Sequence, residues 1–190
     1  ELASMILGDL GATVTKIEPP GGSASRYTGP FIADIIDPEN SLTYHAYNRN
    51  KRSVVLDLNK KWDRDRFLPL VRQADFLFES DKPGGMSSRG LGFEELRTIN
   101  PNLIYVAITP FGQNGPYAHF AATDLTIAAM SGPISLQGES DRAPVRLSLP
   151  QVWRHAAVEA SVGALTAHAR MLQTGLGQFV DLSAQCTMVW

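Results

Sequence analysis

The chain has 190 residues, of which 44% are hydrophobic and 19% charged, a balance typical of soluble globular proteins that excludes a disordered chain. Its 17 Lys and Arg against 19 Asp and Glu give a formal charge of −2, so no general positive field attracts nucleic acid or an anionic membrane. The sequence shows neither a signal peptide nor a membrane-spanning stretch, and its single cysteine, Cys186, cannot form a disulfide within the chain. These features predict a cytoplasmic protein.

Both ends of the chain have the pattern of elements cut short. Apolar residues recur at helical spacing from the first positions, in Leu2, Met5, Ile6 and Leu10, and residues 184–190 form a largely apolar run without a cap or a turn. We therefore expect residues 1–190 to be a partial domain of a longer protein.

The first third of the chain predicts two strands separated by a loop. Residues 12–18 are rich in β-branched side chains and predict a strand that ends at a Pro-Pro-Gly-Gly turn. Residues 21–50 lack periodicity and are rich in Gly, Pro, Asp and Asn, which predicts a long surface loop. Residues 52–58 predict a second strand, and the spacing of apolar residues over 62–73 predicts a helix.

The rest of the chain continues this alternation. Apolar runs over 76–78 and 103–108 predict strands, residues 150–173 predict a long helix rich in small residues, and residues 178–182 predict a last strand. Small residues in the long helix would allow another backbone to approach closely. Strands that alternate with helices predict an α/β fold, with a parallel sheet flanked by helices and ligands at the carboxyl ends of the strands.

Polar residues that follow predicted strands are the first candidates for a site. Arg26 could bind a phosphate with two hydrogen bonds, or it could lie in a solvated loop. The turn at residues 79–86 could place backbone amides along a ligand, or it could simply connect two elements. The sequence has no metal-ligand spacing and no glycine-rich nucleotide motif, so we expect no metal site and no nucleotide site of those kinds.

Further candidates lie at and before the long helix. Asp124 precedes an apolar helix, which it could cap through its carboxylate, or it could take part in catalysis. His155 and Glu159 are four residues apart and share a helix face, as either an acid–base couple or a surface pair. Trp153 is expected to anchor a core or an interface.

Several phrases of this sequence occur together in one known family. In chain order they are Leu7-Gly8-Asp9-Leu10-Gly11-Ala12, Lys16-Ile17-Glu18-Pro19-Pro20-Gly21-Gly22, residues 48–58, Gly90-Leu91-Gly92, Asn100-Pro101-Asn102-Leu103-Ile104-Tyr105, residues 111–117, Asp124-Leu125 and Thr174-Gly175-Leu176-Gly177-Gln178. With these motifs in this order over nearly its whole length, the chain resembles the family III coenzyme A transferases, which include the α-methylacyl-CoA racemases.

The resemblance implies an α/β fold with a Rossmann-like sheet, of which this chain forms the N-terminal part of the large domain, and a dimer of interlocked subunits. It also implies a reaction. Family members move coenzyme A (CoA) between carboxylic acids through an aspartate, which attacks the acyl thioester and forms mixed anhydrides and an enzyme-bound CoA thioester in turn.

The sequence departs from the family at the reacting group. Alignment on the two ends of the long helix places Trp153 where the family has this aspartate, and an indole cannot form an anhydride. The racemases also need a histidine before the Asp124 position, where this chain has Thr123. Two hypotheses remain. Either another carboxylate performs the covalent step, such as Asp124, Glu159 or one outside this chain, or the chain is a catalytically silent domain that is half of a tandem fusion or an acyl-CoA-binding scaffold.

The resemblance also implies contacts with CoA, although unevenly. Arg26, Leu56 and Lys82 match family positions that bind CoA, with Leu56 beside the adenine. Ser80 and Asp81 replace an Asn-Phe pair of the family, and Ser88 and Asn59 replace basic residues. Arg89 is next to Ser88, where the family has an arginine. The loss of two cations and the gain of a carboxylate predict weaker attraction for the CoA phosphates. We expect an acyl-CoA and a carboxylic acid as substrates, a homodimer or a tandem family domain as partner, and no metal.

Overall fold

The computed structural model describes residues 1–189, which fall into two compact units. One unit extends from Glu1 to Arg72 and the other begins at Gln73. Each unit contains its own parallel sheet, so each is described by itself.

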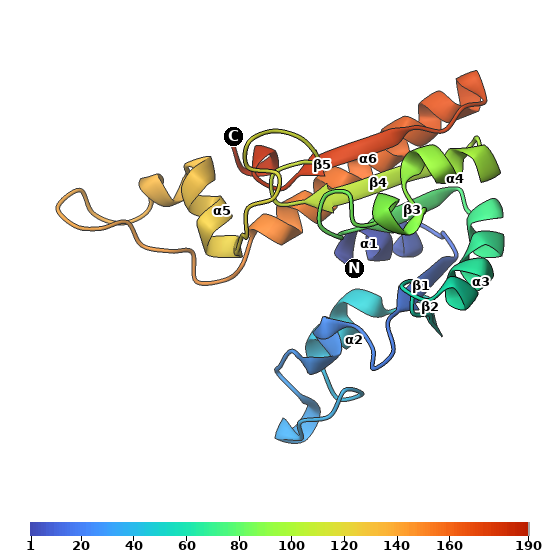
Figure 1. Ribbon diagram of the computed structural model, residues 1–190. Helices are drawn as coiled ribbons and strands as arrows, with labels where there is room; N and C mark the ends of the chain where they lie inside the picture. The colour runs from blue at the N-terminus through green and yellow to red at the C-terminus, as the bar shows by residue number, and fades with distance from the viewer. Residues whose placement is uncertain (190) are drawn as a thin grey trace. The chain divides into compact units, whose positions relative to one another are not determined.

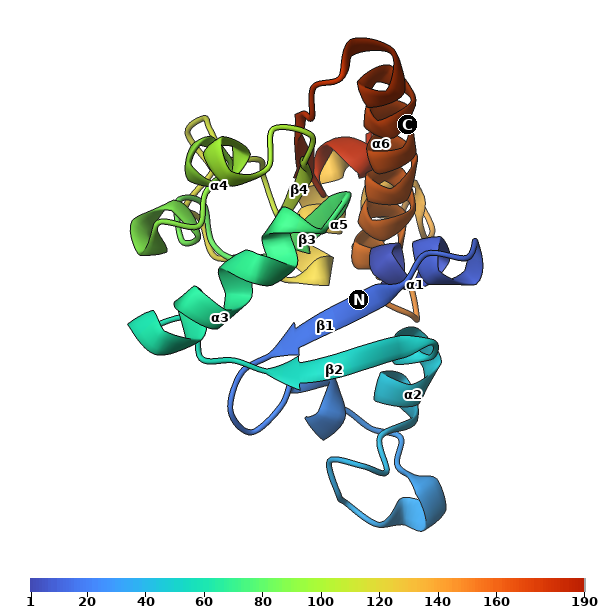
Figure 2. The same cartoon turned by 90° about the vertical axis from the view of Figure 1, so that its right-hand side faces the viewer.

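The first unit is built on a two-stranded parallel sheet (Figure 2). Its elements are α1 (Leu2–Asp9), β1 (Val14–Glu18), α2 (Leu42–Asn48), β2 (Lys51–Val55) and α3 (Lys61–Arg72), with short 3-10 helices at Ala24–Tyr27 and Ile32–Asp34. The strands pair in register from Val14 opposite Lys51 to Glu18 opposite Val55. The predicted helices and strands of this region are confirmed, although the second strand ends at Val55 rather than at Leu58.

The prediction of an unbroken loop over residues 21–50 was wrong, because α2 lies within it. Ser41 begins this helix, since its hydroxyl accepts a hydrogen bond from the Tyr44 N–H at 3.1 Å. The helix has only seven residues, and an isolated helix of this length is not stable by itself. Its formation depends on tertiary contacts that a periodicity argument does not include.

The second unit is built on a three-stranded parallel sheet in the order β3-β4-β5 (Figure 1). Its elements are β3 (Phe76–Glu79), α4 (Phe93–Ile99), β4 (Ile104–Thr109), α5 (Asp124–Ser131), α6 (Val152–Thr174) and β5 (Phe179–Ser183), with short 3-10 helices at Ser87–Arg89, Pro133–Leu136 and Cys186–Met188. The central strand β4 is almost entirely buried, as expected for a parallel strand with neighbours on both edges. The predicted α/β fold with parallel strands is confirmed.

Helix α6 runs alongside β4 and β5 (Figure 1). Its buried residues include Ala156, Ala160 and Ala164, each with no exposed surface. A Cβ atom added at Gly163 would lie 3.1 Å from a Val180 methyl group of β5. The small residues of this helix therefore allow it to approach its own sheet closely.

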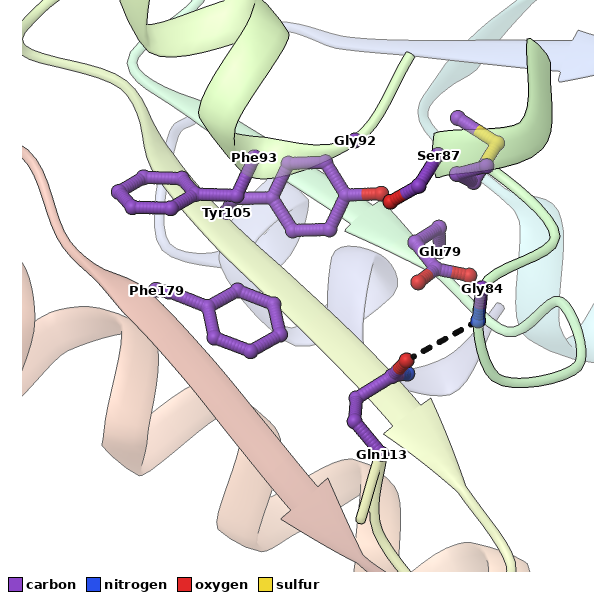
Figure 3. A pocket seen from close by; sticks show the side chains of 9 residues that line it. Glu79, Gly84, Ser87, Gly92, Phe93, Tyr105, Gln113 and Phe179 are labelled. Carbon is purple, nitrogen blue, oxygen red and sulfur yellow. Dashed lines mark hydrogen bonds between the residues drawn. The ribbon is translucent and has the colours of Figure 1, made fainter. Parts of the chain in front are cut away.

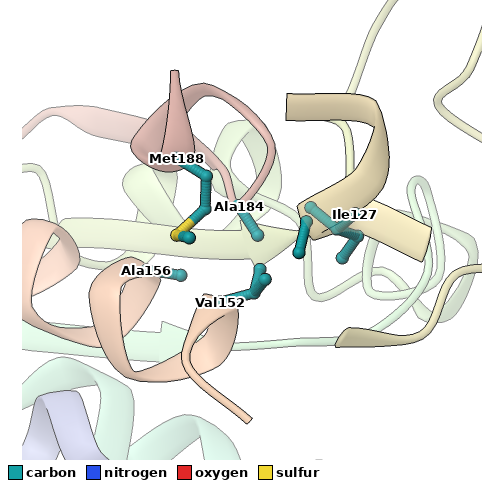
Figure 4. Close-up of a cluster of buried hydrophobic side chains, with 6 residues drawn as sticks. Ile127, Val152, Ala156, Ala184 and Met188 are labelled. Carbon is teal, nitrogen blue, oxygen red and sulfur yellow. The ribbon is translucent and has the colours of Figure 1, made fainter. Parts of the chain in front are cut away.

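A buried cluster fixes the start of α6 (Figure 4). It joins residues of α5, α6 and the last part of the chain, namely Ile127, Ala128, Val152, Ala156, Ala184 and Met188. Val152 is fully buried in this cluster, and Trp153 follows it directly. The position of Trp153 is thus set by core packing one residue earlier in the helix.

Within residues 1–189 no helix has both the length and the apolar character needed to cross a bilayer.

Candidate functional site

A pocket of about 570 Å³ lies in the second unit, where β3 and β4 end and α6 begins. Residues 80–83, which follow β3, form one side, and Ile108 and Pro110 at the end of β4 form another. Residues 118–122 and Trp153 complete the lining. This is the edge of a parallel sheet at which ligands gather, and the volume is within the range of small-molecule sites.

Trp153 is the residue of α6 that reaches the pocket. It is 39% exposed, whereas its neighbour Val152 is fully buried. The sequence prediction placed Trp153 in a core or an interface, and the structure places it in the pocket wall. The position at which the family resemblance expects an aspartate therefore carries an indole that faces this cavity.

Asp124 caps α6 rather than the helix in which it lies. Its carboxylate oxygens accept hydrogen bonds from the backbone N–H groups of Gln151 at 3.3 Å and Val152 at 2.9 Å. These groups belong to the first turn of α6, whose amides lack partners within the helix and favour a negative charge. The prediction that Asp124 caps α5 was wrong, because Thr123 is the N-cap of α5 and forms a capping box with Thr126.

The loop after β3 holds three of the residues expected to contact CoA. Ser80, Asp81 and Lys82 all line the pocket. The Glu79 carboxylate accepts a hydrogen bond from the Asp81 N–H at 2.6 Å, and the Asp81 carboxylate accepts one from the Lys82 N–H at 2.8 Å. Gly85 lies close to this carboxylate, because a Cβ atom at this position would lie 2.5 Å from Asp81 Oδ2 and the Asp81 side chain would have to shift.

Arg89 forms an ion pair with Asp81, and both side chains remain partly exposed. The Arg89 guanidinium offsets the negative charge that the Asp81 carboxylate brings to the pocket wall. The Nε atom of Arg89 is buried and has no hydrogen-bond partner. Arg89 thus affects the charge of the pocket wall through its ion pair with Asp81. The next residue after Asp81 is Lys82, which is exposed.

A second, smaller cavity of about 50 Å³ lies beside the loop after β3 (Figure 3). The rings of Phe93, Tyr105 and Phe179 lie 5.6–6.2 Å apart at this cavity, together with the Glu79 carboxyl. Burial raises the pKa of Glu79 above its ordinary value. Burial, together with the charge of Glu79, also raises the pKa of Tyr105. The cavity has room for water rather than substrate, and Glu79 serves to hold the loop.

Arg26 and Leu56 belong to the first unit. Arg26 donates hydrogen bonds from Nε and Nη2 to the two carboxylate oxygens of Glu18, each at 2.9 Å, and its guanidinium lies 3.8 Å from the centroid of the Tyr44 ring. A further hydrogen bond joins Nη1 to Glu39 at 2.7 Å. Leu56 is 3% exposed. Arg26 therefore holds a buried carboxylate, a role that the sequence prediction did not include.

Neither candidate for an alternative nucleophile lines the pocket. Both oxygens of Asp124 accept backbone hydrogen bonds at the start of α6. Glu159 lies six residues after Trp153 in α6, which places it about 9 Å along the axis and about 240° around it. Its side chain therefore leaves the helix on a different face.

Sequence reasoning missed the contribution of residues 118–122. His119 and Phe120 lie in this segment and line the pocket. The segment follows the turn-rich residues 111–117 after β4, so its position beyond a strand end was the signal that could have found it. Among residues 1–189 no group of three or more His, Cys, Asp or Glu side chains is placed to hold a metal ion.

Comparison with known proteins places the chain in a family. The model of "CoA-transferase family III" matches residues 1–190. The chain is 39% identical over 186 residues to succinate–glutarate CoA-transferase of Agrobacterium fabrum, a match that covers 95% of this chain and 46% of that protein. It is 36% identical over 183 residues to Rv1866 of Mycobacterium tuberculosis, named as a probable CoA-transferase, with 96% of this chain and 22% of that protein covered.

A solved structure agrees with these relatives. The crystal structure of a CAIB/BAIF family protein from Brucella suis superposes with a TM-score of 0.92 at 36% identity, covering 99% of this chain and 50% of that one. The chain thus spans about half the length of that protein and of the Agrobacterium relative. From the family match, the identity and the shared fold, the chain belongs to CoA-transferase family III.

Proposed function

We propose that the protein to which this chain belongs is an acyl-CoA:carboxylate CoA-transferase, and that the pocket beside Trp153 receives the acyl-CoA. The observation that carries this proposal is the pocket itself. It lies at the carboxyl ends of β3 and β4, and it opens beside Trp153, the α6 residue at which the family resemblance predicts the nucleophile. The relatives with CoA-transferase names support the same reaction class.

Lys82 and the loop that carries it are the proposed contact for the CoA phosphates in the second unit. Lys82 is exposed and lines the pocket, and Ser80 and Asp81 offer a hydroxyl and backbone groups beside it. Arg89 supports this contact through its ion pair with Asp81. A lysine ammonium binds phosphate as a point charge, so this contact should weaken as the salt concentration rises.

Arg26 and Leu56 are the proposed CoA contacts of the first unit. Arg26 can reach a phosphate without leaving Glu18, because its Nη1 pairs with Glu39, a side chain that is 76% exposed. An exposed ion pair contributes little to stability and is readily exchanged for another anion. Leu56 is 3% exposed, so the predicted contact with the adenine requires neighbouring groups to move aside.

The covalent step requires a carboxylate that this pocket does not present at Trp153. In the family reaction the carboxylate oxygen bonds to the thioester carbon and the carbon–sulfur bond breaks, which gives a mixed anhydride and CoA thiolate. The thiolate then displaces the acid to form an enzyme thioester, and the acceptor acid reverses both steps. We propose a residue outside this chain for this role, because both oxygens of Asp124 accept backbone hydrogen bonds and Glu159 lies on another face of α6.

A catalytically silent domain is the second candidate function. Trp153 favours it, because an indole in the pocket wall can contact an acyl group but cannot accept it. The length of Rv1866 also supports this candidate. The match covers 22% of Rv1866 but 46% of the Agrobacterium relative, so Rv1866 is long enough for two such regions. In this case the chain would bind acyl-CoA and complete a homodimer or a tandem pair. A cytoplasmic location remains part of both proposals.

Covalent trapping of the full-length protein distinguishes the two candidates. The protein is incubated with an acyl-CoA, treated with hydroxylamine or borohydride, and examined by intact-mass measurement and peptide mapping. A carboxylate modified at one site, together with CoA exchange into a panel of carboxylic acids, supports the transferase. Absence of both, with retained acyl-CoA binding, supports the silent domain.

A further inference from the structure

We infer that the pocket beside Trp153 selects an apolar acyl group and discriminates against one that ends in a second carboxylate. This inference rests on the proposed acyl-CoA binding and goes beyond it by assigning the substrate class. Its basis is the chemistry of the pocket wall at the point where α6 begins.

Most of the described residues that line the pocket are apolar. They include Ile108, Pro110, Ala118, Phe120, Ala122 and Trp153, whereas His119 lies in the same segment as Phe120. Phe120 is 56% exposed and Trp153 39%, so both rings have surface that an acyl group can cover. A hydrocarbon chain placed against this wall removes apolar surface from water, which stabilises the complex by about 0.8 kcal/mol for each buried methylene group.

The pocket does not offer a second acidic group an equivalent partner. Among the described residues that line it, Lys82 is the only one with a permanent positive charge, His119 offers ring nitrogens for a hydrogen bond, and Asp81 carries a negative charge beside Lys82. Arg89 is already paired with Asp81. A carboxylate at the far end of an acyl chain would lose its hydration against the apolar part of the lining, and Lys82, the one permanent cation there, is the proposed contact of the CoA phosphates.

The backbone at the start of α6, just before Trp153, is held in place from two directions. Val152 is packed in the buried cluster, and the Asp124 carboxylate accepts the N–H groups of Gln151 and Val152. Because the backbone before Trp153 is constrained, a ligand that covers the ring does not have to order this part of the chain. Trp153 is therefore a specificity-determining residue of the proposed site.

The test measures binding of a series of thioesters to the full-length protein by isothermal titration calorimetry. CoA, butanoyl-CoA, hexanoyl-CoA, octanoyl-CoA and succinyl-CoA are compared without an acceptor acid. We expect affinity to rise with acyl length, with octanoyl-CoA bound at least about tenfold more tightly than CoA, and succinyl-CoA bound no more tightly than CoA. Succinyl-CoA that binds more tightly than octanoyl-CoA, or affinity that does not change with acyl length, overturns the inference and leaves the proposed function intact.

Two variants locate the effect in this pocket. Trp153→Ala and Phe120→Ser should each reduce the advantage of octanoyl-CoA over CoA about fivefold or more, with CoA titrated into each variant as its own reference. Trp62→Ala is the matched control, because Trp62 is 75% exposed in α3 of the first unit and lies outside the lining. An octanoyl advantage that survives both pocket variants removes the assignment to this wall. A protein that binds neither CoA nor any thioester overturns the proposed function itself.

Discussion

The two units each contain an arginine–carboxylate pair, and the pairs differ in their surroundings. Glu18 in the first unit is 1% exposed and accepts hydrogen bonds from Arg26, Ser53, Tyr44 and the Ser23 N–H. Asp81 in the second unit is partly exposed, lines a pocket and pairs with Arg89. A buried charge must have every partner in place, whereas a partly exposed charge can exchange its partner for water or a ligand. The first pair therefore holds the fold, and the second adjusts the charge of a site.

The largest effect is expected from breaking the buried pair. Glu18→Ala leaves the Arg26 guanidinium without its main partner and also removes the acceptor for Tyr44 and Ser53, so the free energy of unfolding should fall by about 3–5 kcal/mol. Urea denaturation followed by circular dichroism measures this change. Glu39→Ala removes the exposed partner of the same arginine and should cost less than about 1 kcal/mol. Equal losses in the two variants would show that burial does not distinguish the contacts.

A medium effect is expected at the start of α6. Asp124→Ala removes the acceptor for the N–H groups of Gln151 and Val152 and should lower the free energy of unfolding by about 1–2 kcal/mol. Asp124→Asn keeps a side-chain oxygen and should retain most of the stability, which separates loss of the cap from loss of charge. The same denaturation measurement applies, with Thr123→Ala as the control that removes the cap of α5 alone. An alanine variant as stable as the wild type would contradict the capping role.

A small effect on stability and a larger one on binding are expected from the partly exposed pair. Asp81→Asn should change the free energy of unfolding by less than about 1 kcal/mol. Because it removes a negative charge beside Lys82, it should tighten CoA binding about threefold at low salt, and the gain should shrink at high salt. Calorimetric titration at two salt concentrations measures this, with Glu94→Gln on the exposed face of α4 as the control. Weaker CoA binding by Asp81→Asn would mean that the carboxylate itself is needed to shape the loop.

The smallest effect is expected from Glu79, which should make the free energy of unfolding depend on pH in the opposite direction to Glu18. The hydrogen bonds from Arg26 hold the pKa of Glu18 well below its ordinary value, so its contribution is present above that value and is lost as the pH falls. Burial raises the pKa of Glu79, so the folded state favours its protonated form and stability declines as the pH rises from the ordinary value through the raised one. Glu79→Gln should remove that decline.

Urea denaturation over a series of pH values tests this prediction. The stability of Glu79→Gln relative to the wild type should increase as the pH rises from about 4.5 toward neutrality. Gln keeps an oxygen that can accept the Asp81 N–H, so the loop contact is largely preserved. A difference that stays constant over this range would show that Glu79 titrates alike in the folded and unfolded chains.

Strand prediction succeeded where a local pattern carries the information. The β-branched residues 12–18 and the apolar runs that became β3, β4 and β5 were identified from single segments of sequence. Helix α2 was missed because a seven-residue helix depends on contacts such as the Ser41 cap more than on periodicity. The candidate turn at residues 79–86 was predicted from its place after a strand, and the same rule applied to β4 would have found His119 and Phe120.

The sequence by itself determined the family and the parallel α/β architecture, because motifs and hydrophobic periodicity are local properties of the chain. It also predicted that Trp153 stands where the family has an aspartate. Only the tertiary structure decided that Asp124 caps α6 instead of its own helix, that Arg26 is held by buried Glu18, and that Trp153 faces a pocket with Phe120. These arrangements bring together residues that are 8 to 33 positions apart in the sequence. Which partner a polar or aromatic side chain meets is set by how the elements pack, a property absent from any one segment.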